Sequence, residues 1–140
     1  MRYMVIVKSN PTTEAGKMPA TEVLEAMGRF NEEMARAGIL LAGEGLHPST
    51  EGARVRINPD SSTTVTDGPF TETKELVAGF WILQVRSRDE AVEWASRMPT
   101  GGHETELEIR RVFDAEDFGD AFSPEQRERE QRLRNEIGQS

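Results

Sequence analysis

The spacing of apolar residues along the chain predicts an alternating order of strands and helices. Residues 2–8 are rich in β-branched and aromatic side chains, which is typical of a short strand. Between Thr21 and Ala37, apolar residues recur every three or four positions and form one stripe of an α-helix, which Gly38 ends. Further apolar runs predict strands at 39–42, 79–86 and 105–112, and a second helix that begins with the cap Ser87 and stops at Pro99.

An additional hairpin interrupts this order. Residues 53–58 alternate Val55 and Ile57 with Arg54 and Arg56, as expected of a half-exposed strand. A turn at 59–62 then leads into a partner strand at 63–67. The polar segments 10–19 and 44–52 are predicted to be loops.

The resulting order, β-α-β, hairpin, β-α-β, predicts an α+β domain with the ferredoxin-like fold in residues 1–112. Two helices would cover one face of an antiparallel sheet. No third helix is predicted in those residues to cover the other face. We therefore expect a homodimer that forms through the sheet.

Composition narrows the possible classes of function. The 140 residues carry a net charge of −8, which argues against nucleic acid or an anionic membrane as partner. The absence of Cys excludes disulfides, thiolate nucleophiles and Cys-based metal sites. No run approaches the roughly 18 apolar residues of a spanning helix. We expect a cytoplasmic protein with no cofactor and no metal site.

Residues 113–140 form an acidic extension, with eight acidic residues against four arginines and a net charge of −4. Ser123 and Pro124 predict a helix start at about residue 123. Such a helix has few apolar residues and would be marginal alone in water. It is either a solvated tail, pinned by Phe118 and Phe122 to the body or to the other subunit, or a docking arm for another protein.

Candidate chemistry gathers where two strands end. Glu44 and His47 leave the second strand, and the turn after the hairpin begins at Asp67. If these ends meet, they form one cleft with His47 and Asp67 as an acid/base pair. The ligand-binding candidates beside them are Glu44, Phe70, Glu72 and Lys74. The alternative is that Asp67 is a turn residue and His47 a loop residue without chemistry.

The segment 66–75, Thr-Asp-Gly-Pro-Phe-Thr-Glu-Thr-Lys-Glu, resembles the signature of the DGPF group of YCII-related proteins. Residues 43–49, Gly-Glu-Gly-Leu-His-Pro-Ser, are similar to a subset of that group. The resemblance implies a dimeric α+β barrel and an extracytoplasmic-function sigma factor as a protein partner. Some YCII-related proteins carry a His/Asp dyad at the first helix, but residues 21–37 contain neither residue type.

Three hypotheses about function follow. The first is a dimer that binds a small molecule and serves an accessory or regulatory role, with a sigma factor as a possible partner. The second is a lyase or isomerase that uses His47 and Asp67. The third is a purely structural dimer.

Overall fold

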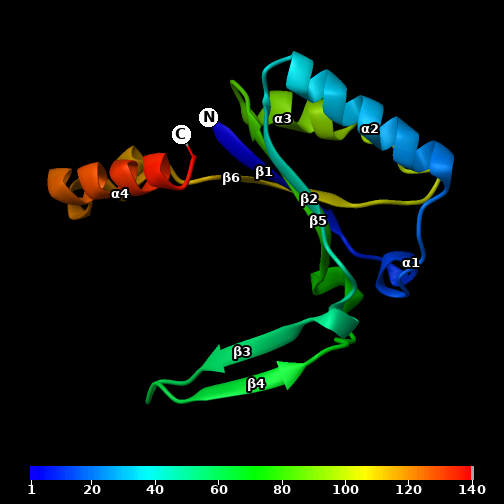
Figure 1. Ribbon diagram of the computed structural model, residues 1–140, viewed down its shortest axis with the longest axis horizontal. Helices are drawn as coiled ribbons and strands as arrows, with labels where there is room; N and C mark the ends of the chain where they lie inside the picture. Colours follow the sequence, from blue (N-terminus) through cyan, green and yellow to red (C-terminus); the bar gives the residue numbers. More distant parts are fainter. Residues whose placement is uncertain (140) are drawn as a thin grey trace.

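The computed structural model describes residues 1–139 and has a mixed α+β fold built on an antiparallel sheet (Figure 1). In chain order the strands and α-helices are β1 (Arg2–Lys8), α1 (Pro11–Glu14), α2 (Thr21–Arg36), β2 (Leu40–Gly45), β3 (Ala53–Ile57), β4 (Thr63–Asp67), β5 (Val77–Gln84), α3 (Arg88–Ala95), β6 (Leu107–Arg111) and α4 (Pro124–Glu136). Short 3₁₀ helices lie at η1 (Ser49–Glu51), η2 (Thr73–Glu75) and η3 (Ala115–Ala121). Within residues 1–139, no helix is long and apolar enough to cross a membrane.

The main sheet has four strands in the order β2-β5-β1-β6, and all neighbouring strands are antiparallel. β1 occupies an interior position, where Val5 lies opposite Trp81 of β5 and Ile109 of β6. The hairpin β3–β4 forms a separate two-stranded sheet. The strand predicted at residues 2–8 is therefore confirmed, and β3 and β4 lie at the two segments predicted to be extended, 53–58 and 63–67.

α2 and α3 lie on one side of the four-stranded sheet and cover that face (Figure 1). The predicted stripe of the first helix is confirmed, because Phe30 and Met34 are its buried residues. Gly38 follows the helix with a left-handed φ of 74°, a conformation that glycine adopts without steric cost. The buried core is completed by Tyr3, Val5, Ile39, Trp81, Leu83, Val85, Ala91 and Ala95.

The other face of the sheet presents the intervening side chains of β1 and β5. Because strand side chains alternate between faces, Met4, Ile6, Phe80 and Ile82 point away from α2 and α3. All four are half-buried in the single chain. On this side the hairpin β3–β4 projects away from the body, and α4 lies beyond the end of β6 (Figure 1). We call this surface the open face.

Several predicted boundaries were wrong. Residues 11–14 are helical, because the side chain of Asn10 accepts a hydrogen bond from the backbone of Thr13 and the Thr13 hydroxyl accepts one from the backbone of Asn10. The second strand continues to Gly45, so Glu44 is a strand residue paired with Phe80 and not part of a loop. Pairing with β5 supplies the backbone partners that hold this Gly-rich segment extended.

The second helix also differs in detail. Its cap Ser87 accepts from the backbone N–H of Glu90 as predicted, but the Glu90 carboxylate accepts from the backbone and guanidinium of Arg86. These bonds from Arg86 stabilise the charged form and lower the pKa of Glu90. The helix ends at Ala95, where tighter turns begin, and therefore stops before Pro99.

The hairpin was expected to bury one face, but every residue of both its strands is exposed in the single chain. Val55 and Val65 are each 62% exposed and Ile57 is 74% exposed. An isolated two-stranded hairpin is marginally stable in water. These apolar side chains are therefore available to a surface outside the single chain.

Candidate functional site

The two loops that contain the predicted site residues meet at the base of the hairpin. The backbone N–H of Gly68 donates to the carbonyl of Gly52 at 2.9 Å, and the N–H of Phe70 donates to the Ser49 hydroxyl at 3.0 Å. A Cβ at Gly68 would overlap the carbonyl oxygen of Ser49 and lie 2.7 Å from its carbonyl carbon. Glycine is required here by this close approach and not by a left-handed backbone, since the φ of Gly68 is not positive.

Ser49 connects these loops to α1. Its backbone N–H donates to the two carboxylate oxygens of Glu14 at 3.0 and 3.2 Å, and its hydroxyl also donates to that carboxylate. Both side chains are half-buried. Glu14, Ser49 and the backbone of Phe70 therefore form a continuous chain of hydrogen bonds that holds the base of the hairpin.

His47 contacts a carboxylate other than those expected. Its Nδ1 lies 2.7 Å from Oε2 of Glu51, four residues further along the chain, and the two side chains are 83% and 63% exposed. Within residues 1–139, no hydrogen bond or ion pair joins His47 to Asp67 or to Glu44. This contact could have been predicted from the sequence, because Glu51 lies only four residues after His47, within reach across the turn at Pro48 and Ser49.

The other predicted residues are spread around the hairpin base. Asp67 is the last residue of β4, opposite Ala53, and the ring of Phe70 lies under the guanidinium of Arg54 at 3.9 Å. Glu72 precedes η2 and Lys74 lies within it; both are exposed. In the described part of the chain, no hydrogen bond or ion pair connects any two of Glu44, His47, Asp67, Phe70, Glu72 and Lys74. Their proposed roles in binding or catalysis stay predictions.

A second place, which sequence reasoning missed, is a hollow of about 940 Å³ between the open face and the residues after β6. Met4, Ile6 and Gln84 of the sheet contribute one side. The segment from Phe113 through η3 to α4 contributes the other, and we call residues 113–139 the C-terminal arm. The sequence feature that could have indicated this place is the pair Met4 and Ile6. Both are apolar and alternate with the core residues of β1, so they form an apolar surface on the face opposite the core.

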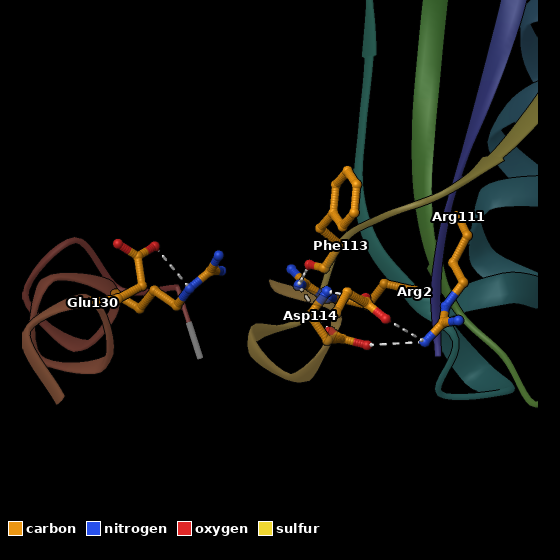
Figure 2. Close-up of polar contacts among 7 residues, drawn as sticks. Arg2, Arg111, Phe113, Asp114 and Glu130 are labelled. Carbon is orange, nitrogen blue, oxygen red and sulfur yellow. Dashed lines mark hydrogen bonds and ion pairs between the residues drawn. The ribbon is translucent and has the colours of Figure 1, made fainter. Parts of the chain in front are cut away.

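Ion pairs fix the end of the hollow nearest the sheet. Nη2 of Arg2 lies 3.1 Å from the Asp114 carboxylate and donates to the carbonyl of Phe113 at 2.9 Å. Arg111 lies 3.8 Å from Asp114 and 3.6 Å from Asp117. Figure 2 shows Arg2 and Arg111 converging on Asp114, with Glu130 on the separate helix α4. This network attaches the first residues of the arm to β1 and β6.

The hollow is cationic although the chain is strongly acidic. Its lining contains the five arginines 2, 110, 111, 127 and 134 against the three carboxylates of Asp114, Glu116 and Glu130, a net charge of +2. The whole chain carries −8. The lining is therefore richer in positive charge than the chain as a whole, and two carboxylates just outside it, Glu108 and Asp117, pair with Arg110 and Arg111.

Three phenylalanines form a row along the arm. The rings of Phe113 and Phe118 stack at 5.0 Å between centroids, and Phe118 and Phe122 lie 5.6 Å apart. Phe113 and Phe118 remain largely exposed. The row therefore offers ring faces and edges to a molecule in the hollow.

The chain is similar in sequence to known proteins. Residues 1–116 match the sequence model of the YCII-related domain. An uncharacterized protein of Rhizobium meliloti (strain 1021), R00369, is 32% identical over 97 residues, which span 68% of this chain and 77% of that protein.

Among solved structures, a similar chain is 5-chloro-2-hydroxyhydroquinone dehydrochlorinase (TftG) from Burkholderia phenoliruptrix AC1100, in complex with 2,5-dihydroxybenzoquinone. The identity is 16% and the TM-score 0.47, over 81% of this chain and 94% of that one. A likeness at this level supports no conclusion about the chemistry of the present chain.

Proposed function

The chain belongs to the YCII-related domain family, and from that premise we propose that it is a homodimer that binds a small molecule in the hollow beside the C-terminal arm. The observation that carries the proposal is the hollow itself. Its volume of about 940 Å³ lies within the size range of ligand pockets, and its lining combines apolar and aromatic side chains with eight charged ones. In this reading the protein has an accessory or regulatory role.

The strand order supports a finer description of the fold. In β2-β5-β1-β6, each helix connects two antiparallel-sheet strands that are not neighbours, which is the pattern of a ferredoxin-like domain. We propose this fold for residues 1–112, with the hairpin as an insertion and residues 113–140 as an extension. The DGPF group is the subgroup we propose within the family.

The open face supports dimerisation through the sheet. Met4, Ile6, Phe80 and Ile82 form a contiguous apolar patch, because Met4 pairs with Ile82 and Ile6 with Phe80 across β1 and β5. Patches of this kind on a sheet are usually covered by another layer. In a dimeric α+β barrel that layer is the sheet of the second copy, and the hollow then lies at the edge of the interface.

Thermal unfolding against a panel of phenolic, amino-acid and keto-acid metabolites tests ligand binding. A ligand at about 100 times its Kd stabilises the protein by roughly 2.7 kcal/mol, which raises Tm by several degrees. We expect at least one compound to do this for the wild type but not for Gln84→Trp, whose side chain would fill the hollow from β5. Glu93→Trp, on the exposed surface of α3, is the control and should respond like the wild type. No shift with any compound would contradict the proposal.

Catalysis by His47 and Asp67 is a second proposal, favoured by the meeting of their loops at the hairpin base. A positioned acid or base contributes about a hundredfold or more to a rate. Any turnover should fall by that factor in His47→Ala, and an unchanged rate would exclude His47.

A sigma factor as partner also stays a prediction. Removal of residues 113–140 should abolish its co-purification if the arm is the contact, and retained binding would refute that role.

A further inference from the structure

We propose that the hollow selects aromatic carboxylates, and that Arg127 of the C-terminal arm binds the carboxylate. The inference rests on the proposed function, since it names the ligand class of the same hollow. It depends on three observations: the pairing of the arginines in the lining, the row of phenylalanine rings, and the place of Arg127 in the chain.

Most arginines of the lining already face carboxylates. Arg2 and Arg111 bind Asp114, and Nε of Arg134 lies 3.3 Å from Glu130. Arg110 lies 3.6 Å from Glu108 on the same strand. These four side chains are partly neutralised and hold the walls of the hollow in place.

Arg127 is different. Within residues 1–139 no carboxylate lies within ion-pair distance of its guanidinium, which donates from Nε to the Phe122 carbonyl at 3.2 Å and from Nη2 to the Gly119 carbonyl at 3.4 Å. An arginine side chain has five N–H donors in a planar fork. The bonds to the two carbonyls orient the fork and leave donors for an added carboxylate, which arginine binds in bidentate geometry.

The remaining surface favours a ring behind that carboxylate. Phe118 and Phe122 lie in the aromatic row beside Arg127, and Arg127 itself lies 5.9 Å above the Phe122 ring. Met1 and Val112, which also line the hollow and lie outside the proposed dimer patch, provide apolar contact. An aromatic ring can stack on these phenylalanines while its carboxylate reaches the guanidinium.

The position of Arg127 makes this selectivity a property of the arm. The match to the YCII-related domain ends at residue 116, before Arg127. The sheet side of the hollow therefore comes from the family domain, and the anion-binding side comes from the extension. A charge-rich helix with few apolar residues is suited to this task, because its side chains are not committed to a core.

Calorimetric titration with benzoate and its neutral counterpart benzamide tests the inference on the full-length protein. We expect benzoate to bind the wild type about tenfold or more tightly than benzamide. Arg127→Gln should remove that preference and leave benzamide affinity unchanged. Arg129→Gln is the matched control, since it removes the same charge from α4 outside the lining of the hollow. It should keep the preference.

Arg127→Lys guards against a loss caused by disturbance of the arm. It keeps the positive charge without the planar fork, so a reduced but measurable preference for benzoate supports the inference. Equal binding of benzoate and benzamide to the wild type would overturn the inference while leaving the hollow a ligand site. If neither probe nor any panel compound bound, the proposed function would fail as well. Displacement of benzoate by an oligoglutamate peptide of higher affinity would overturn the inference in favour of protein docking.

Discussion

Gly68→Ala is expected to destabilise the protein by about 3 kcal/mol, the upper end of the cost of overpacking a well-packed site. The added methyl group would overlap the carbonyl oxygen of Ser49 and approach the Gly52 carbonyl oxygen to 3.4 Å. Both neighbours are backbone atoms, so neither can move away by a change of rotamer. The loops that hold the hairpin must separate to admit the methyl group.

Urea unfolding at one fixed protein concentration measures this effect, because the stability of the proposed dimer would depend on protein concentration. Gly45→Ala is the control, since a Cβ at Gly45 meets nothing within 4 Å. It should change the free energy of unfolding by no more than about 0.5 kcal/mol. A Gly68→Ala variant as stable as this control would mean that the loops are not packed together as described.

Gly68→Ala should not affect ligand binding in the hollow. The hairpin base lies near the Lys8 end of β1, where Ser9 N–H donates to the carbonyl of Leu76. The hollow extends along the same strand from Met1 to Ile6, and none of the residues that line it belongs to the hairpin or to the loops at its base. Ligand binding in the hollow should therefore survive in the folded fraction of the variant.

The elements that the sequence predicted well are those specified by nearby residues. The β-branched and aromatic residues at 2–8 predicted a strand, and the three-and-four spacing predicted a helix face that carries Phe30 and Met34; both elements bury one face in the structure. Caps are equally local, as Ser87 and Ser123 show. Each signal lies within about one turn or one strand, and tertiary packing agrees with it.

The candidate site was less predictable because its contacts join distant parts of the chain. Ser49 meets Glu14 across 35 residues, and Arg2 meets Asp114 across 112. The spacing of apolar residues along the chain does not indicate which residues so far apart in sequence come into contact. Gly68 shows a different limit, since glycine is needed there because the Ser49 backbone lies too close for a Cβ, and no local pattern indicates that contact. His47 was predicted to pair with Asp67, which is far away in the sequence, but its contact is with Glu51, four residues away.

Ile82→Asp is expected to convert the proposed dimer into a monomer. Ile82 is flanked on the open face by Met4 of β1 and Ala42 of β2, so a carboxylate there would have no cationic side chain directly opposite it. Leaving a buried charge without a partner costs roughly 3–5 kcal/mol. In a two-fold dimer the change occurs in both copies, so association should weaken by at least about two to three orders of magnitude.

Sedimentation velocity at micromolar concentration should then give a species of 15.7 kDa for Ile82→Asp and twice that mass for the wild type. Val92→Asp is the matched control, because Val92 is an exposed apolar residue on α3, on the helix-covered side of the sheet. It should remain dimeric. Circular dichroism of both variants reports whether the monomer is folded, and Ile82→Thr provides a milder second variant that should raise the dissociation constant without a buried charge.

The neighbours of Ile82 explain why this substitution separates association from folding. Trp81 and Leu83, on either side, point to the core under the helices, and Trp81 Nε1 donates to Asn31 of α2 at 2.9 Å. Alternate residues of β5 therefore face the core on one side of the sheet and the open face on the other. Ile82→Asp should leave the core side of β5 intact, whereas a dimer that persisted in this variant would exclude the open face as its interface and direct the search to the exposed hairpin.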